Sequence, residues 1–345
     1  METGIVPYIT LFHWDYPYEL YKKGGWLNSE SSEWFAEYTG VVIRRLSDRV
    51  KHWITFNEPQ CFIGLGHHRG THAPGLKLSF DDLMAASHNF LLSHGKAVQT
   101  IRAFQKQPCQ VGYAPTGTIC YPDQENSANI EAARNATFSV KELNFENHAW
   151  WSDPIYLGKY PEDGLKLFEQ FLPEIGQNDL QIINQPLDFV GLNIYHGRPV
   201  EAGVDGDAVD VPKYEGFPQT HIHWPVTPEA LYWGPKFMYE RYKKPILITE
   251  NGLSCADVVS LDGKVHDSNR IDYLHRYLKQ YKRAADDGVD LAGYFTWSVM
   301  DNFEWAEGYH HRFGLIYVDY LTQKRIIKDS GYWYKSVINS NGECL

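Results

Sequence analysis

Residues 245–252 of this 345-residue chain read PILITENG, an apolar run that ends in threonine, glutamate, asparagine and glycine. An apolar run without polar alternation predicts a strand that is buried on both faces. In α/β proteins the functional groups lie at the carboxyl ends of such strands. The stretch therefore predicts a parallel strand that presents Glu250 at its end.

The same pattern recurs along the chain, with helical stretches between the apolar runs. These stretches carry apolar residues at three- and four-residue spacing, which is typical of amphipathic helices. Alternating strands and helices predict an α/β fold with a parallel sheet, either open or closed into a barrel. The predicted strands are Tyr8–Phe12, His52–Phe56, Gln110–Tyr113, Asp188–Asn193, Pro245–Thr249 and Leu291–Trp297. The predicted helices are Ser31–Leu46, Asp81–Gln105, Ala128–Val140, Pro228–Tyr242, Asn269–Asp287 and Asp329–Ser340.

The composition argues against several classes of protein. Acidic residues number 43 and basic residues 32, and the resulting net charge of −11 is the opposite of what a nucleic-acid binder carries. Five scattered cysteines without a C-x-x-C pair argue against a disulfide framework and a zinc site. No apolar run approaches the ~18–20 residues of a membrane helix, and no signal-peptide pattern opens the sequence. We therefore expect a cytoplasmic protein that binds neither nucleic acid nor membranes.

Unusual polar clusters follow four of the predicted strands. His13, Asn57, Glu58, Glu250 and Trp297 all lie at or just after a strand end. Glu58 and Glu250 are far apart in sequence, yet a barrel would bring both to one rim. Two carboxylates of which one is protonated and one ionised are the requirement for cleaving a glycosidic bond. This chemistry needs no metal and no redox cofactor, and the sequence has no convincing motif for either.

A single glutamate at a strand end is more often a solvated loop residue than a catalytic one. Here two glutamates each lie in a strand-end motif that also carries asparagine, and this repetition favours catalysis. Aromatic residues make up 15% of the chain, and tryptophan and tyrosine offer flat faces on which sugar rings stack.

The ordered set of motifs resembles glycoside hydrolase family 1, the family of β-glucosidases and β-galactosidases. The resemblance implies a TIM (β/α)8 barrel and a retaining mechanism, with residues 1–345 forming a single barrel domain. The stretches that carry it are Pro7–Asp15, Gly24–Trp26, Thr55–Pro59, His72–Gly75, Asn193–Tyr195, Ile248–Gly252, Trp297–Trp305 and Arg312–Leu315.

The resemblance also implies a role for each matching residue. Glu58 would be the acid/base and Glu250 the nucleophile. Asn57 would hydrogen-bond the sugar 2-hydroxyl, and Tyr195 would orient the nucleophile. The other residues implied to contact the sugar or its leaving group are His13, Trp14, Asn193, Trp224, Trp297, Glu304, Trp305 and Phe313.

Two of these residues narrow the expected substrate. Glu304 would bind the 4- and 6-hydroxyls and would repel a 6-phosphate, which disfavours a 6-phospho-β-glucosidase. Trp305 would bind the 3-hydroxyl. Glu58 stands where the related thioglucosidases carry glutamine, which favours an O-glycosidase. We expect hydrolysis of unphosphorylated β-glucosides or short β-linked oligosaccharides in cellulose degradation, with β-galactosides and β-fucosides as side activities.

The resemblance begins at the family's third strand. The first two βα units have no counterpart in this sequence, so we expect a barrel truncated at its N-terminus to about six units. The alternative is an inactive fragment or a sugar-binding remnant. Self-association into a homo-oligomer and a separate N-terminal segment are two ways in which such a barrel could be completed.

Cys61 and the pair His68 and His72 lie near the motifs, and we expect them to have structural roles and not catalytic or metal-binding ones. Cys61 is expected to be a small buried thiol, because no His–Asp arrangement clearly serves it. His68 and His72 are four residues apart, a spacing that could hold zinc on a helix, but Gly66 and Gly70 predict a loop. We therefore expect no metal site there.

Overall fold

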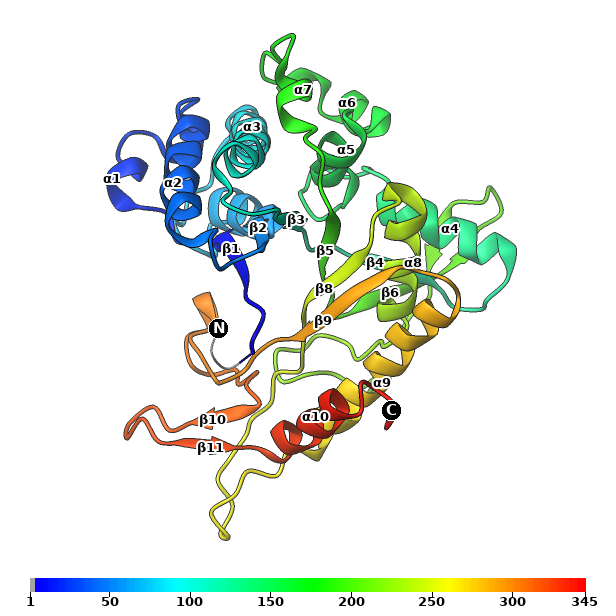
Figure 1. Cartoon of the computed structure of the whole chain (residues 1–345). Helices are drawn as coiled ribbons and strands as arrows, with labels where there is room; N and C mark the ends of the chain where they lie inside the picture. The colour runs from blue at the N-terminus through cyan, green and yellow to red at the C-terminus, as the bar shows by residue number, and fades with distance from the viewer. Residues whose placement is uncertain (1–3) are drawn as a thin grey trace. The chain divides into compact units, whose positions relative to one another are not determined.

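The computed structural model describes residues 4–345, which form two compact units. The first unit comprises residues 4–117, 137–192 and 242–245, and the second comprises residues 118–136, 193–241 and 246–345. Figure 1 labels the helices and strands of both.

Parallel strands form the centre of the first unit. β1 (Tyr8–Phe12) pairs with β2 (His52–Asn57), β2 with β3 (Gln110–Ala114), and β3 with β5 (Phe189–Asn193). The last residue of β5 belongs to the second unit. The helical segments are α1 (Tyr18–Tyr21), a 3-10 turn (Gly25–Leu27), α2 (Ser31–Leu46), a π-helix (Gln60–Arg69), α3 (Phe80–Phe104), α5 (Ala149–Leu157), α6 (Glu162–Leu167), a 3-10 turn (Glu169–Phe171) and α7 (Asp179–Ile183).

Helices α2 and α3 lie side by side next to β1 and β2 (Figure 1). The Ser79 hydroxyl caps α3 by accepting from the Asp82 N–H at 3.3 Å, and Asp81 and Asp82 in the first turn complement the helix dipole. Rings from both strands and from neighbouring helical segments pack together, with centroids 4.3–6.4 Å apart. We call this set the aromatic cluster; its members are Phe12, Trp26, Phe35, Phe56, Phe62 and Phe90.

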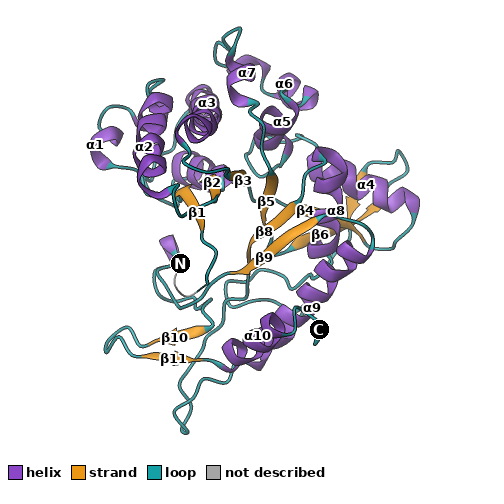
Figure 2. Cartoon of the chain, viewed as in Figure 1, coloured by secondary structure: helices purple, strands orange, loops and turns teal. Residues whose placement is uncertain are grey.

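The second unit contains a parallel pair, a small sheet and a hairpin (Figure 2). β8 (Ile246–Asn251) pairs in parallel with β9 (Leu291–Thr296). The small sheet has the order β4 (Ile119–Pro122), β6 (Gly197–Ala202) and β7 (Ala208–Asp210), and the hairpin joins β10 (Ile316–Val318) to β11 (Arg325–Ile327). The helices are α4 (Ser127–Phe138), which ends in the first unit, α8 (Ala230–Tyr242), which also ends there, α9 (Ser268–Asp286), a 3-10 turn (Trp305–Glu307) and α10 (Asp329–Asn339).

All six predicted parallel strands and all six predicted helices are present, with ends that shift by no more than two residues. β2, β3, β5 and β8 are buried along most of their length, as the apolar runs predict. The expectation of two buried faces is wrong for β9, in which no residue is buried. The physical reason is position, because β9 is the last strand of its sheet within residues 4–345. The sequence did not predict the short strands β4, β6, β7, β10 and β11.

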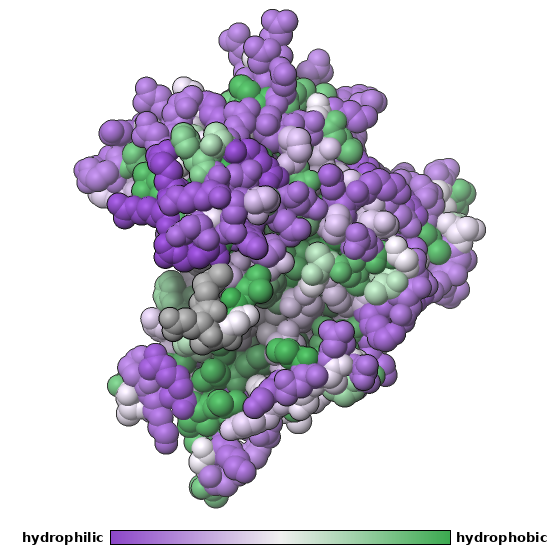
Figure 3. All heavy atoms as spheres, in the orientation of Figure 1, coloured by the Kyte–Doolittle hydropathy of each residue, from purple (hydrophilic) through white to green (hydrophobic). Residues whose placement is uncertain are grey.

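Figure 3 shows mainly hydrophilic side chains over the visible sides of α2 and α3. Within the described residues, no helix is both long and apolar enough to cross a membrane.

Candidate active site

Two neighbouring strands of the first unit bring three of the candidate residues together. Trp14, just after β1, donates its indole N–H to the carbonyl of Asn57 at the end of β2, at 3.1 Å. The Asn57 side-chain nitrogen lies 3.3 Å from His13 Nε2. Burial lowers the pKa of His13 to about 4, although Asp15 acts in the opposite direction. His13 is therefore neutral at pH 7 and contributes no positive charge to this part of the site.

Glu58 lies directly after β2 in a conformation that glutamate rarely adopts. Its φ is +45°, in the left-handed region, and its N–H donates to the Ala114 carbonyl of β3 at 2.8 Å. Only 6% of the residue is exposed. A left-handed backbone at a non-glycine residue costs energy, and such residues cluster at active sites.

Cys61 contacts this glutamate, which the sequence did not predict. Its thiol donates to Glu58 Oε2 at 3.1 Å, from the first turn of the π-helix. The expectation of a buried thiol is wrong in this respect, because Cys61 is only half-buried. The position three residues after Glu58 is the signal that could have suggested the contact.

In the second unit a phenol holds Glu250 at the end of β8. The Tyr195 hydroxyl donates to Glu250 Oε2 at 2.7 Å, and the Ile194 N–H donates to the Glu250 carbonyl at 3.0 Å. The Tyr195 carbonyl accepts from the hydroxyls of Tyr273 and Tyr277 at 2.8 and 2.9 Å. A fixed donor on a carboxylate oxygen stabilises the ionised form. The sequence did not predict that two tyrosines of α9 would hold Tyr195.

The residues around Glu250 also bind one another. Thr249 donates its hydroxyl to Asn193 Oδ1 at 2.5 Å. The Trp297 N–H donates to the Asn251 carbonyl at 2.8 Å. A Cβ on Gly252 would lie 1.9 Å from the Trp297 carbonyl oxygen, so only glycine fits at this approach of two backbones. The glycine of the 245–252 stretch therefore lets the segment after Glu250 contact Trp297.

Three aromatic side chains gather beside the nucleophile candidate. The ring of Tyr195 lies 5.0 Å from that of Trp224 and 6.1 Å from that of Phe313, and Trp224 and Phe313 are 6.2 Å apart. Phe313 is only 2% exposed, whereas Trp224 is half-buried. The buried Phe313 thus packs against two half-buried rings, those of Tyr195 and Trp224.

Residues 297–305 form the loop after β9, which we call the 297–305 loop. It carries three half-buried candidates, Trp297, Glu304 and Trp305. Trp305 has a φ of +45°, and the Glu304 N–H donates to the Gly308 carbonyl at 2.7 Å. Trp14, Glu58 and Trp305 are thus three candidate residues with left-handed backbones.

The histidine-rich segment lies at the end of the π-helix and in the turn that follows it. The predicted loop is wrong for His68, because the π-helix extends to Arg69. Gly66 lies within this helix, where it makes room for the following turn. A Cβ on Gly66 would lie only 2.6 Å from the Ala73 carbonyl oxygen. Among residues 4–345 no three His, Cys, Asp or Glu side chains are grouped as a metal would require.

Comparison with known proteins assigns the chain to a family. The family model described as glycosyl hydrolase family 1 matches residues 1–343. This chain belongs to glycosyl hydrolase family 1. Among its relatives, a 1,4-beta-D-glucan glucohydrolase of Thermotoga neapolitana is 45% identical, over 99% of this chain and 76% of the relative. A bifunctional beta-D-glucosidase/beta-D-fucosidase of Bifidobacterium breve is 36% identical, over 98% and 76%.

Solved family 1 structures share the fold. A β-glucosidase from Thermotoga maritima in complex with glucoimidazole has a TM-score of 0.87 at 44% identity, covering 99% of this chain and 76% of that one. The parallel strands of this chain are accordingly those of the family's TIM barrel. About a quarter of each of these relatives has no counterpart in the printed sequence.

Proposed function

We propose that this family 1 chain is a retaining β-glucosidase that releases terminal β-D-glucosyl residues from β-glucosides and short β-linked oligosaccharides. The observation that carries the proposal is the 2.7 Å hydrogen bond from Tyr195 to Glu250. It gives the proposed nucleophile a fixed donor, and a nucleophile must stay ionised to attack. The relatives named β-glucosidase and glucan glucohydrolase support the same activity.

In the first step of the proposed mechanism, a carboxylate oxygen of Glu250 attacks the anomeric carbon. The bond from that carbon to the leaving oxygen breaks, and Glu58 gives its proton to the oxygen as it departs. The products are the free aglycone alcohol and a glycosyl ester on Glu250, with Glu58 now ionised. The anomeric configuration is inverted at this point.

In the second step, Glu58 takes a proton from a water molecule whose oxygen attacks the anomeric carbon. The ester bond breaks, Glu250 leaves as a carboxylate, and the sugar is released with its original configuration. Retention requires the two carboxyl groups to lie about 5–5.5 Å apart during the reaction. Ionised Glu250 at that range favours a protonated Glu58 in the first step.

The remaining candidates would bind the sugar and its leaving group. Asn57 would hydrogen-bond the 2-hydroxyl, with His13, Trp14 and Asn193 close to the sugar or its neighbouring residues. Trp297, Glu304 and Trp305 would form the wall around the other hydroxyls, and Trp224 would lie at the leaving-group side. The carboxylate of Glu304 excludes a 6-phosphate by repulsion. The fucosidase activity named for the Bifidobacterium relative supports β-fucosides as a side activity.

We also propose that the printed chain contains six of the βα units of the barrel, corresponding to β1, β2, β3, β5, β8 and β9. The unburied strand β9 supports this count. A chain with six units could be an active enzyme or an inactive sugar-binding remnant. A measurement of hydrolytic activity decides between these two possibilities. A homo-oligomer and a cytoplasmic location stay predictions.

The test is labelling with 2,4-dinitrophenyl 2-deoxy-2-fluoro-β-glucoside. The fluorine slows both steps and the good leaving group restores the first, so the ester on the enzyme accumulates. We expect intact-mass analysis to show one fluoroglucosyl group and peptide mapping to place it on Glu250. The Glu250→Gln variant is the control and should stay unlabelled. NMR of the first product formed from an aryl β-glucoside should show the β-anomer. A labelled residue other than Glu250, or an α-anomer formed first, would contradict the mechanism, and binding without labelling or turnover would identify a remnant.

A further inference from the structure

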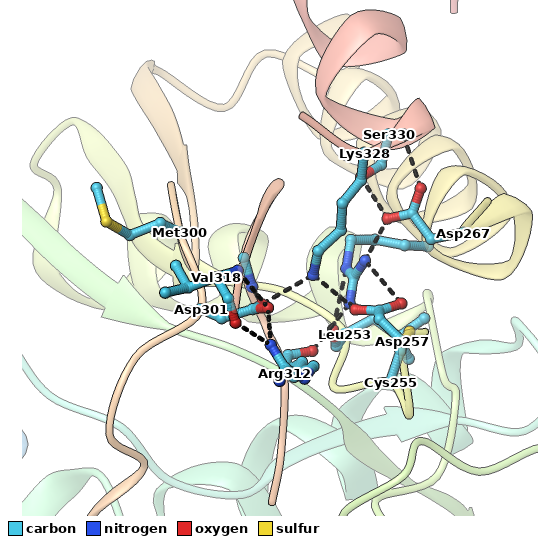
Figure 4. Close-up of polar contacts among 12 residues, drawn as sticks. Leu253, Cys255, Asp257, Asp267, Met300, Asp301, Arg312, Val318, Lys328 and Ser330 are labelled. Carbon is cyan, nitrogen blue, oxygen red and sulfur yellow. Dashed lines mark hydrogen bonds and ion pairs between the residues drawn. The ribbon is translucent and has the colours of Figure 1, made fainter. Parts of the chain in front are cut away.

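Six charged side chains form an alternating network inside the second unit (Figure 4). Three are carboxylates and three are cations, so the network is neutral as a whole. Five of the six side chains are at most 4% exposed, and Arg312 is 14% exposed. In order of contact, the members of this ion-pair network are Asp267, Arg270, Asp257, Lys328, Asp301 and Arg312.

The contacts within the network are short and continuous. Arg270 pairs with Asp267 and lies 2.7 Å from Asp257. Lys328 Nζ is 2.6 Å from Asp257 Oδ2 and 2.8 Å from Asp301 Oδ1. Asp301 Oδ2 in turn lies 2.6 Å from the Arg312 guanidinium. Each of the four members between Asp267 and Arg312 therefore has a partner of opposite sign on either side.

Asp301 is the member that belongs to the 297–305 loop. Its Oδ1 accepts from Lys328 and from the Gly314 N–H at 3.0 Å, and its Oδ2 accepts from Arg312 and from the Val318 N–H at 3.3 Å. Gly314 permits this approach, because a Cβ there would lie 2.1 Å from the Asp301 nitrogen. With two donors on each oxygen, the Asp301 side chain has one position.

The other end of the network reaches the segment that follows Glu250. The Arg270 guanidinium donates to the Leu253 carbonyl at 3.3 Å and to the Arg312 carbonyl at 2.8 Å. The Cys255 N–H donates to that same Arg312 carbonyl at 2.9 Å. The network thus joins the segment after the proposed nucleophile to the loop that carries Glu304 and Trp305.

Stability alone does not account for this arrangement. Burying charges costs solvation free energy, and well-packed apolar residues often give equal or greater stability in place of a buried ion pair. What a fully satisfied buried polar network provides is one defined geometry. Here the network gives one defined geometry to the 297–305 loop, which carries the candidate sugar-binding residues Glu304 and Trp305.

We propose that Asp301 is a positioning residue for sugar recognition. Held by Lys328 and Arg312, it fixes the 297–305 loop so that Glu304 and Trp305 meet the 3-, 4- and 6-hydroxyls of the glucosyl group. Asp301 itself does not touch the substrate. The proposal rests on the proposed β-glucosidase function.

The test compares two substrates in the full chain and its Asp301→Asn variant. One is an aryl β-glucoside, and the other is its 4,6-dideoxy analogue, which lacks the hydroxyls assigned to Glu304. We expect the variant to lose about 30–100-fold in kcat/KM on the glucoside, because misplacement of about an ångström has effects of this size. On the dideoxy analogue the loss should be less than about a tenth of that. Loss of folded protein would lower both rates by the same factor.

Two further variants make the result interpretable. Asp272→Asn is the matched control, since Asp272 forms an exposed ion pair with Arg276 at 2.8 Å on the same unit, and its rates should be unchanged. Arg312→Gln removes one cation from Asp301 but leaves Lys328 in place. Because Arg312 is the most exposed member, this variant serves if Asp301→Asn does not fold, and it should show the same preference for the dideoxy analogue.

An equal loss on both substrates, in whichever variant folds, would overturn the proposal. Failure of the proposed function has a different signature, namely no turnover by the unmodified chain. In that case amide hydrogen exchange decides whether the network holds the loop. Faster exchange confined to residues 297–318 in the variant supports a loop held by Asp301, and unchanged exchange there overturns it.

Discussion

The two proposed catalytic glutamates end strands of the same kind, yet different donors hold them. Within the first unit Glu58 accepts from the Cys61 thiol at 3.1 Å, and within the second Glu250 accepts from the Tyr195 hydroxyl at 2.7 Å. A phenol is a much stronger hydrogen-bond donor than a thiol. These contacts favour the ionised form at Glu250 more than at Glu58. Such a difference between two carboxylates is how one site provides both an acid and a nucleophile.

The supports of β2, which precedes Glu58, and of the 297–305 loop, which carries Glu304 and Trp305, also differ. β2 is supported by the aromatic cluster and by His94, whose Nδ1 lies 2.8 Å from the Thr55 hydroxyl. The loop after β9 is supported by the ion-pair network through Asp301. Apolar packing holds the acid side and charges hold the sugar-binding side. The support of β2 depends on close packing of aromatic rings and on a neutral His94. The support of the 297–305 loop depends on every charge of the ion-pair network being present.

The largest effect should come from Glu58→Gln, which tests the acid role directly. We expect kcat/KM for an alkyl β-glucoside to fall about 10³-fold, because general acid catalysis contributes roughly 10²–10⁴-fold. A 2,4-dinitrophenyl β-glucoside has a leaving group that needs no proton, so its glycosylation step should be affected far less. Steady-state and burst kinetics on the two substrates provide the measurement. Equal losses in the first step would remove Glu58 from the role of acid.

Tyr195→Phe should have the next largest effect. Without the phenolic donor the ionised form of Glu250 is less stable, so kcat/KM should fall about 10²-fold. The acidic limb of the pH–rate profile should also move to higher pH. Cys61→Ala is the matched control on the other glutamate, and it should change kcat/KM by less than about 3-fold, because a thiol is a weak donor. If the two variants lose activity equally, the comparison between the two glutamates is wrong.

The sequence predicted the strands that position the site because a buried parallel strand carries its own signal. The run before Glu250 is apolar at nearly every position, and the run before Asn57 contains Trp53, Ile54 and Phe56, so both could be recognised as strands from the sequence. The failure at β9 has a physical origin. LAGYFT is as apolar as the others, and its exposure depends on which strands lie beside it.

Contacts between distant side chains were beyond sequence reasoning. The motifs and the family resemblance pointed to Glu250 and Tyr195, and the structure brings these two together. No sequence pattern predicted that Tyr273 and Tyr277 would hold Tyr195. Their hydroxyls reach the Tyr195 carbonyl only because α9 packs beside it in the folded chain. The ion-pair network was missed for the same reason, since its members are spread over residues 257–328.

The support of β2 by a neutral histidine gives the smallest predicted effect, and it concerns stability rather than rate. Burial lowers the pKa of His94 to about 3, well below its ordinary value of 6.5. At pH 5 the unfolded chain therefore binds a proton that the folded chain does not, and stability falls as the pH drops below 6.5. Over those 1.5 pH units the cost is about 2 kcal/mol.

Urea unfolding at pH 7 and pH 5 measures this cost. His94→Gln keeps a polar side chain beside Thr55 but cannot titrate, so its free energy of unfolding should change about 2 kcal/mol less between the two pH values than that of the unmodified chain. His148, which burial also shifts to a pKa of about 4, remains in the variant and preserves part of the pH dependence. His310→Gln, at an exposed position, should behave like the unmodified chain. An identical pH dependence in all three proteins would show that β2 does not require a neutral His94, and the acid side would then depend on the aromatic cluster alone.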